Sequence, residues 1–111
     1  MAENCLFCNM VAGAIPCQKA GENDQVLAFH DIHPQAPTHI LVIPKTHTPS
    51  LSETEDATLL GALMAGVRQV ATEQGLTDYR LVINNGPQAG QTVFHLHAHI
   101  LAGRPLHWPP G

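Results

Sequence analysis

The sequence predicts an α+β fold in which one long helix packs on a mostly antiparallel sheet. Two observations support this expectation. Apolar residues repeat at helical spacing over one long stretch in the middle of the chain, and short segments rich in β-branched residues stand on both sides of it. A chain of 111 residues is long enough for one hydrophobic core. We therefore expect a single domain over residues 1–111, in which residues 105–111 form a tail.

Before the long helix, the chain predicts a short helix and two strands. Residues 4–12 have helical potential, and residues 26–30 (VLAFH) and 39–44 (HILVIP) are typical of strands. Residues 31–37 predict the turn between these strands. Pro44 ends the second strand because proline has no backbone N–H to continue a ladder.

The long helix is predicted over residues 53–74. Ser52 and Glu55 form a capping-box pattern, in which the Ser52 hydroxyl accepts from the Glu55 N–H and the Glu55 side chain reaches back. Gly75 fits the left-handed residue that ends a helix, and Leu76 can supply the apolar contact that accompanies it. The apolar stripe that faces the core consists of Leu60, Leu63, Met64, Val67, Val70 and Ala71.

Two further strands are predicted after the helix, at residues 79–84 and 93–101. A polar loop at residues 85–90 connects them, and it contains glycine. Because strands joined by a short connection usually pair, we expect these two strands to be antiparallel neighbours.

Histidines alternate with apolar residues in the last predicted strand, at His95, His97 and His99. Alternate side chains share one face of a strand, so the three imidazoles should point one way while Phe94 and the apolar residues between the histidines point into the core. The outer two histidines would lie about 13 Å apart along the strand. One metal ion cannot bind all three across that distance, so each should have a separate role and a mononuclear metalloenzyme is not expected. A merely polar outer face is the alternative interpretation.

The charge balance excludes a nucleic-acid polymer as a partner. The formal net charge is -4 with five Lys and Arg, whereas a duplex or a long single strand requires a run of cations. A single phosphate needs no such patch, because backbone N–H groups and imidazoles can hold it.

No apolar run approaches the roughly 18 residues of a membrane span, and the N-terminus lacks the basic region and cleavage site of a signal peptide. We therefore expect a cytoplasmic protein that does not bind a membrane.

The three cysteines are Cys5, Cys8 and Cys17. An odd count without a secretory signal argues against a disulfide framework. The C-x-x-C spacing of Cys5 and Cys8 suits a zinc ion, a redox pair or two unpaired core thiols, and no thioredoxin-like context favours the redox interpretation. Zinc would need further ligands, for which distant histidines are candidates.

The histidine segment resembles the signature of the histidine triad (HIT) family, in which histidine alternates with apolar residues. The resemblance covers nearly the whole chain, including residues 29–47 (FHDIHPQAPTHILVIPKTH), 89–99 (AGQTVFHLHAH) and 106–111 (LHWPPG). It is closest to the Hint branch of purine nucleoside phosphoramidases, in a bacterial type. The resemblance implies the HIT fold, an antiparallel five-stranded sheet with one long helix and a short N-terminal helix, and it implies a homodimer.

The resemblance assigns catalytic roles to four residues. His97 matches the nucleophile, which attacks phosphorus to give a nucleotidyl-histidine that water then cleaves, while a backbone carbonyl holds its other ring nitrogen. His99 would donate to a non-bridging phosphate oxygen, and His39 would support the triad from another strand; a simply packed His39 is the alternative. Thr92 stands where the branch often has serine, and its hydroxyl could serve the phosphate or the leaving amine, although the extra methyl group could alter the fit.

The resemblance also implies a binding site for a purine nucleotide, AMP or GMP. Asp31 would bind the ribose hydroxyls, since one carboxylate can accept from two vicinal hydroxyls. Phe7, Phe29 and Ile32 would line the base pocket, although apolar residues there could equally belong to the core. The phosphate cradle would consist of Asn84, Gly90, Gln91, Thr92 and Val93, for which an ordinary turn is the alternative. We assign no role to His33 or Cys17.

Two further features follow from the resemblance. His47 and His95 match the positions that complete a structural zinc site with Cys5 and Cys8 in some bacterial members, separate from a catalytic step that needs no cofactor. Trp108 would lie near the active site of a partner subunit, on the leaving-group side. Docking of Trp108 within its own chain is the alternative.

The function that the resemblance implies is hydrolysis of the P–N bond in purine nucleoside 5′-phosphoramidates, such as AMP-lysine or aminoacyl-adenylate compounds. A dinucleoside polyphosphate hydrolase is an alternative within the same chemistry, and the WPPG ending argues against it. A nucleotide-binding or zinc-held interaction module with little turnover is the alternative from another class.

Overall fold

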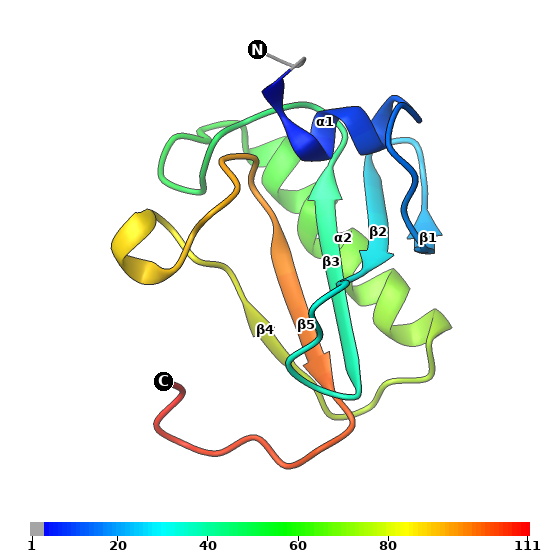
Figure 1. Cartoon of the computed structure of the whole chain (residues 1–111), viewed down its shortest axis with the longest axis vertical. Coiled ribbons are helices and arrows are strands. Elements are labelled where there is room, and N and C mark those ends of the chain that lie inside the picture. Colours follow the sequence, from blue (N-terminus) through cyan, green and yellow to red (C-terminus); the bar gives the residue numbers. More distant parts are fainter. Residues whose placement is uncertain (1–3) are drawn as a thin grey trace.

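The fold is a five-stranded antiparallel sheet with strand order β1-β2-β3-β5-β4, seen in a computed structural model that describes residues 4–111. The long helix α2 lies behind the sheet and the short helix α1 crosses one end of its front (Figure 1). The predicted α+β architecture is therefore confirmed, and the first three residues of the expected domain lie outside the described residues. The elements are α1 Leu6–Val11, β1 Lys19–Glu22, β2 Val26–His30, β3 Thr38–Pro44, α2 Ala57–Glu73, β4 Arg80–Val82, the 3-10 turn η2 Pro87–Ala89 and β5 Ala98–Ala102.

Both faces of the sheet are covered. On the α2 face, Val42 and Ile100 pack with Leu63 of the helix, whereas on the opposite face Phe29 and other apolar residues pack with Phe7 of α1. Because neither face is open to water at the centre, β2 and β3 are continuous apolar runs and do not alternate with polar residues. This front face, opposite α2, is the face on which the histidines gather.

The start of α2 differs from the prediction. The helix begins at Ala57, and Asp56 caps it by accepting from the N–H groups of Thr58 and Leu59. The predicted capping box is wrong because Ser52 is held elsewhere: its N–H donates to Asn85 Oδ1 at 2.8 Å. A bond between two loops thus outcompetes the local capping pattern.

The end of α2 agrees with the prediction. Gly75 adopts φ +72°, and the Leu76 N–H donates to the Ala71 carbonyl at 2.9 Å. These are the left-handed residue and the backbone bond of a Schellman motif. Among the described residues, no helix is both long and apolar enough to cross a membrane.

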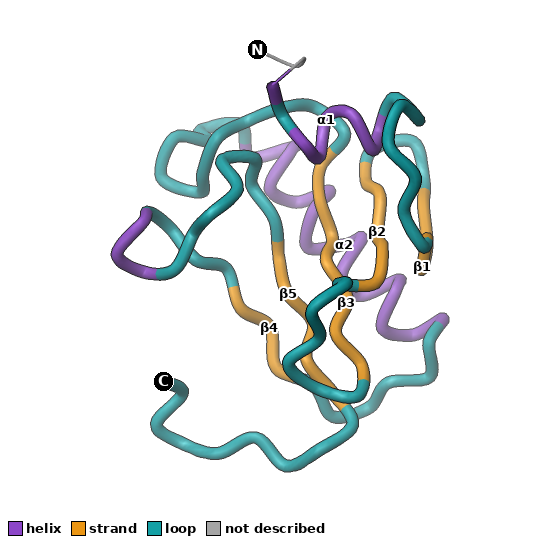
Figure 2. The backbone as a smooth tube through the Cα atoms, viewed as in Figure 1, coloured by secondary structure: helices purple, strands orange, loops and turns teal. Residues whose placement is uncertain are grey.

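The last two strands pair as predicted but are shorter. Leu81 of β4 lies opposite Ile100 of β5, yet residues 93–97 form an irregular bend before β5 (Figure 2). The His95 carbonyl accepts from the His97 ring at 2.7 Å, and the Leu96 N–H donates to the Thr48 carbonyl at 2.7 Å. Because these backbone groups bond to a side chain and to a loop, they do not continue the sheet ladder.

The bend corrects the expected position of Phe94. His95 is fully buried and turns toward α1, whereas Phe94, expected in the core, is 48% exposed. Leu96, Ala98 and Ile100 all pack in the core on the α2 face, so the alternation extends through the bend into β5. His95, His97 and His99 share the opposite face, as predicted: Phe7 packs against the first two rings, and the rings of His97 and His99 lie 5.0 Å apart.

Candidate active site

A cavity of about 440 Å³ opens on the sheet face opposite α2. Its walls come from α1, from the end of β2 and the loop after it, and from the segment before β5. The expected site residues that line it are Phe7, Phe29, Asp31, Ile32, His39, Thr92, Val93, His97 and His99. The structure thus brings most of the predicted catalytic and nucleotide-binding residues together around one space.

His97 is held in one tautomer. Its Nδ1 lies 2.7 Å from the His95 carbonyl oxygen, so Nδ1 carries the proton and Nε2 keeps a free lone pair. The Phe7 ring packs edge-on against the imidazole at a centroid distance of 5.1 Å. Burial lowers the pKa of His97 below its ordinary value, and the bond to the His95 carbonyl opposes this only in part. Near neutral pH this side chain is an oriented, uncharged imidazole with a free lone pair on Nε2.

His39 and His99 form a hydrogen-bonded pair whose proton positions can be assigned. The Gln35 backbone N–H donates to His39 Nδ1 at 3.0 Å, so the neutral His39 carries its proton on Nε2. That Nε2 lies 2.9 Å from His99 Nδ1, which accepts, so His99 carries its own proton on Nε2. Burial, followed by the neighbouring His97 and His39, lowers the pKa of His99 to about 4. At neutral pH, His99 is an uncharged hydrogen-bond donor.

Asp31 stands directly after β2 at the rim of the cavity. Its Oδ1 accepts from the His33 N–H at 2.8 Å, and its Oδ2 lies 3.4 Å from His39 Nε2. The carboxylate has lone pairs left for further donors, and its side chain is 19% exposed. It can therefore accept from hydroxyl groups of a ligand that enters the cavity.

The three expected base-pocket residues differ in burial. Phe7 and Phe29 are buried and meet edge-to-face at 5.4 Å, so they belong to the core as well as to the cavity wall. Ile32 is 86% exposed at the rim. Phe7 and Phe29 are therefore both core residues and cavity-lining residues, and their role in a base pocket stays a prediction. Ile32 is exposed enough to contact a ligand.

The expected phosphate loop separates into two parts. Thr92 and Val93 line the cavity, whereas Asn84, Gly90 and Gln91 are absent from its described lining. Gly90 adopts φ +102°, and a Cβ added there would lie 3.6 Å from Asn84 Nδ2, so the Asn84 side chain lies next to Gly90.

Gln91 is 3% exposed, and its side-chain amide is engaged within the protein. It accepts from the Gly86 N–H at 2.9 Å and donates to the carbonyls of Pro49 at 2.8 Å and Val93 at 3.1 Å. The side chain of Gln91 thus braces the loop that carries Thr92.

Sequence reasoning missed several lining residues. Cys17 and Gln18 line the cavity because β1, which follows them, pairs with β2, and His33 lines it beside Asp31. The Gln35 N–H, which sets the tautomer of His39, is a backbone group that no residue pattern reveals. Only the strand pairing and the loop path bring these groups to the site.

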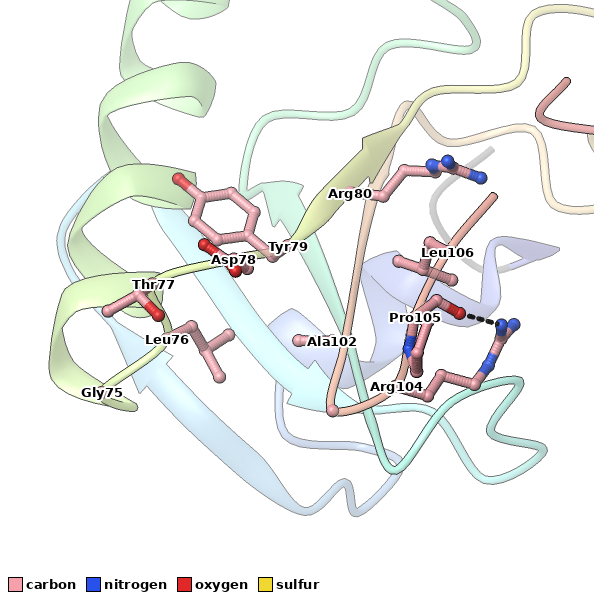
Figure 3. A pocket seen from close by; sticks show the side chains of 11 residues that line it. Gly75, Leu76, Thr77, Asp78, Tyr79, Arg80, Ala102, Arg104, Pro105 and Leu106 are labelled. Carbon is pink, nitrogen blue, oxygen red and sulfur yellow. Dashed lines mark hydrogen bonds between the residues drawn. The ribbon is translucent and has the colours of Figure 1, made fainter. Parts of the chain in front are cut away.

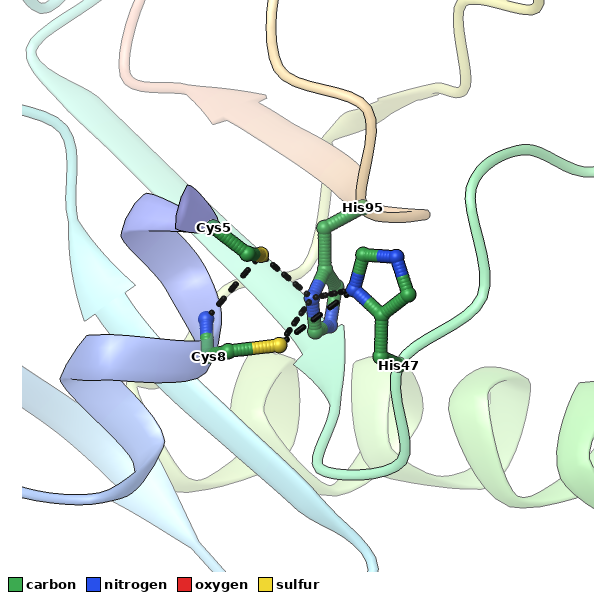
Figure 4. Close-up of side chains that lie close together, drawn as sticks. All are labelled: Cys5, Cys8, His47 and His95. Atoms are coloured by element: carbon green, nitrogen blue, oxygen red, sulfur yellow. Dashed lines mark hydrogen bonds between the residues drawn. The ribbon is translucent and has the colours of Figure 1, made fainter. Parts of the chain in front are cut away.

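Cys5, Cys8, His47 and His95 meet beside the cavity, and we call them the thiol–imidazole cluster (Figure 4). His95 Nδ1 lies 3.3 Å from Cys5 Sγ, 3.5 Å from Cys8 Sγ and 3.2 Å from His47 Nδ1. Cys8 Sγ lies 3.3 Å from His47 Nδ1. The four predicted ligands, which come from three separate segments of the chain, thus face one point.

The donor set fits a tetrahedral zinc ion. Bonds of about 2.3 Å to sulfur and about 2.0 Å to nitrogen would separate sulfur from nitrogen by about 3.5 Å and two nitrogens by about 3.3 Å. The observed separations of 3.2 to 3.5 Å match these values. His95 Nε2 donates to the Pro44 carbonyl at 2.8 Å, which leaves the Nδ1 lone pair directed at the cluster.

The Cys8 thiol would not ionise by itself at neutral pH. Burial, followed by the neighbouring Cys5, raises the pKa of Cys8 to about 11. A bound cation favours the thiolate and would reverse this preference. The cluster therefore has the geometry of a metal site and needs a positive charge to become one.

A second, more open cavity of about 690 Å³ lies between the loop after α2 and the C-terminal tail (Figure 3). It is larger than the histidine cavity, but its lining contains none of the predicted catalytic residues. Arg80 on its wall donates to the His107 carbonyl of the tail at 2.7 Å. Trp108, farther along the tail, is 82% exposed, so the alternative of docking within its own chain is wrong.

Comparison with known proteins gives consistent matches along the chain. A family model described as the HIT domain matches residues 12–106. An uncharacterized HIT-like protein from Synechocystis sp. is 52% identical over the full length of both chains.

Solved structures also match nearly the whole length of this chain. A HIT family hydrolase from Legionella pneumophila is 44% identical with a TM-score of 0.92, over 97% of this chain and 100% of that one. A histidine triad nucleotide-binding protein from Candida albicans is 32% identical with a TM-score of 0.83, over 96% of this chain and 83% of that one.

Proposed function

Because the chain belongs to the HIT domain family, we propose that it hydrolyses the phosphorus–nitrogen bond of purine nucleoside 5′-phosphoramidates. Solved relatives described as HIT family hydrolases support a hydrolase. The WPPG ending and the motif around Asp31 favour the Hint branch of that family. AMP or GMP would be the nucleotide product, and an amine would be the leaving group.

The observation that carries this proposal is the locked tautomer of His97. Its Nδ1–H is held by the His95 carbonyl, and the Nε2 lone pair is left for the cavity. Neutral imidazole with a directed lone pair is a competent nucleophile toward phosphorus. Because the nucleophile is the side chain itself, the proposed chemical step uses no cofactor.

In the proposed reaction, a bond forms between His97 Nε2 and the α-phosphorus while the P–N bond breaks. The departing nitrogen takes up a proton, for which the Thr92 hydroxyl on the cavity wall is the candidate donor. Water then attacks the nucleotidyl-histidine and gives a proton back to the Thr92 oxygen, which releases the nucleoside monophosphate and restores both His97 and Thr92. Each step moves one proton and leaves the Nδ1 bond to the His95 carbonyl unchanged.

Two neighbours would bind the substrate. The Nε2–H of His99 would donate to a non-bridging phosphate oxygen, where negative charge grows during attack. The Asp31 carboxylate would accept from the ribose hydroxyls, since it lies at the rim of the same cavity. Phe29 and Ile32 would contact the purine base.

We further propose a structural zinc ion in the thiol–imidazole cluster. Zinc supplies a positive charge that stabilises the two thiolates, and it would tie α1 to the segment that holds His95. Cys5 already caps α1 by accepting from the Cys8 N–H at 3.2 Å, a bond that a thiolate strengthens. In the proposal, the ion stabilises the fold beside the active site.

A homodimer in the cytoplasm remains part of the proposal. Trp108 is 82% exposed, and burying a large aromatic surface is favourable, so a second copy of the chain is its proposed partner. In that arrangement Trp108 would shape the leaving-group side of the partner subunit's site.

Capture of the nucleotidyl intermediate tests the function. Radiolabelled AMP-amide, mixed with excess wild-type enzyme and quenched rapidly, should leave label on the protein, whereas His97→Ala should carry none. Absence of label on the wild type would favour a binding module with little turnover.

Comparison of kcat/KM for an AMP-amide and a diadenosine polyphosphate separates the two hydrolase hypotheses. A higher kcat/KM for the diadenosine polyphosphate would contradict the proposed phosphoramidase activity.

A further inference from the structure

We propose that Arg104, at the root of the C-terminal tail, is a positioning residue that fixes the proton of His99. It acts through the cavity loop, which we define as residues 31–37. This loop supplies Asp31 and the Gln35 N–H to the active site. The kinetic part of the inference rests on the proposed function, whereas the position of the proton does not.

Arg104 holds the cavity loop from 69 residues away along the chain. Its Nε and Nη2 both donate to the Gln35 carbonyl oxygen, at 3.3 and 3.1 Å. Its Nη1 donates to the Pro105 carbonyl at 3.1 Å, the contact drawn in Figure 3, which orients the guanidinium plane. Two N–H groups of one rigid fork thus converge on a single acceptor, which lysine cannot reproduce.

The neighbouring residue packs against the same loop. Gly103 adopts φ +97°, and a Cβ added there would lie 2.8 Å from Pro37 Cβ. Such a separation is a steric clash, so only glycine permits this approach. The root of the tail therefore contacts the cavity loop at two points, Pro37 and the Gln35 carbonyl.

Two further hydrogen bonds connect Gln35 to His99. The carbonyl and the N–H of Gln35 lie in adjacent peptide planes that meet at one Cα, so restraining the carbonyl narrows the directions open to the N–H. That N–H donates to His39 Nδ1, and His39 Nε2–H then donates to His99 Nδ1. If the Gln35 N–H turned away, His39 could take its proton on Nδ1, and His99 would then donate from Nδ1. The Nε2 of His99 would lose its proton and could no longer donate to a phosphate.

The experiment compares Arg104→Met and Arg104→Lys with Arg80→Met. Arg80 is the matched control, because it also holds the tail, through the His107 carbonyl, but has no described bond to the cavity loop. Imidazole ¹⁵N chemical shifts report which nitrogen of His39 and His99 carries the proton, without any substrate. Steady-state kinetics on an AMP-amide then separate kcat from KM.

We expect wild type and Arg80→Met to show both protons on Nε2. Arg104→Met should show mixed tautomers, with kcat lowered roughly tenfold and KM changed little. We expect this loss of kcat to be smaller than the roughly hundredfold loss caused by a 1 Å misplacement at a reacting centre. Arg104→Lys should fall between them, since lysine keeps the charge and a single bond. Arg104 is exposed, so these variants should fold.

Unchanged tautomers in Arg104→Met would overturn the inference, whatever the activity. An equal loss in Arg80→Met would also overturn it, because the effect would then belong to the tail as a whole. If wild type shows no phosphoramidase activity while the tautomers shift as expected, the proposed function fails and the role of Arg104 stands.

Discussion

Two histidine clusters of similar composition lie on the same face of the sheet, and they differ in what they can bind. The thiol–imidazole cluster contains two histidines and two thiols, and the second group, Asp31, His39 and His99, contains two histidines and a carboxylate. We call the second group the Asp–His cluster. In both, the side-chain atoms lie close enough to suggest a metal ion.

The partner on the far side of each imidazole accounts for the difference. His95 donates from Nε2 to the Pro44 carbonyl, so its Nδ1 lone pair faces the other ligands. His39 instead accepts from the Gln35 N–H at Nδ1, so its Nε2 carries a proton toward His99 and Asp31. When a backbone carbonyl accepts from one ring nitrogen, the other nitrogen keeps a lone pair and can bind a metal ion. When a backbone N–H donates to one ring nitrogen, the other nitrogen carries the proton and acts as a donor. Proximity of ligand atoms alone therefore does not identify a metal site.

His97 lies between the two clusters in the chain and belongs to neither, so its loss should separate chemistry from both. We expect His97→Ala to lower kcat by about 10³-fold or more. Metal content and AMP affinity should stay near the wild-type values. Metal analysis and calorimetry with AMP check the separation, and a parallel loss of metal would show that His97 belongs to the thiol–imidazole cluster.

Breaking the thiol–imidazole cluster should affect stability first. Cys8→Ser removes one ligand, and because a structural metal contributes directly to the free energy of folding, Tm should fall by roughly 10 °C. Metal per chain should drop below one, while the folded fraction keeps its kcat. Cys17→Ser is the matched control, since Cys17 is partly buried but lies outside the cluster. An equal fall in Tm for both variants would count against a metal site.

The Asp–His cluster should lose activity without losing metal. His39→Leu removes the donor to His99 and should lower kcat roughly tenfold to a hundredfold, as loss of a supporting partner commonly does. Zinc bound per chain, measured by titration of the metal-free protein, should remain at one. A fall in stoichiometry from two to one would show that His39 is a ligand after all.

Replacement of Asp31, in the same cluster, should change the preference between a ribonucleotide and its 2′-deoxy analogue. Asp31→Ala should weaken binding of AMP by roughly tenfold, the effect of losing a hydrogen bond to a charged group. Binding of 2′-deoxy-AMP should weaken less, because it offers one hydroxyl fewer. Calorimetry with both nucleotides decides the matter, and equal losses would contradict the ribose role.

The smallest effect concerns acid stability. Folding lowers the pKa of His99 to about 4, below the ordinary imidazole value near 6.5. Between these values the unfolded chain binds a proton that the folded chain does not, so stability should fall as pH decreases from 6.5 to 4. His99→Gln should make this decline shallower than in wild type. Tm measured across that range tests the sign, and an unchanged slope would place His99 in a more solvated setting.

The sequence alone determined the features that depend on short-range pattern. The apolar stripe of α2 and the Gly75 ending are set by neighbours a few residues away. They were predicted correctly except at Met64, which was expected to face the core and is 40% exposed at the edge of the stripe. The expectation that the three histidines do not share one metal ion followed from the dimensions of a strand, and the structure places His95 and His99 in different clusters and His97 in neither. The ligand set of the thiol–imidazole cluster followed from resemblance, and the structure brings those four side chains together.

Tertiary structure decided what depends on partners far along the chain. Ser52 fails as a cap because Asn85 binds its N–H, and Gln91 turns inward because the Pro49 carbonyl accepts from it. The tautomer of His95 depends on a carbonyl 51 residues away. Backbone groups are identical along the chain, so no sequence pattern reveals which of them will face a given imidazole. The order of the strands and the paths of the loops determine that choice, and with it the distinction between a metal ligand and a proton donor.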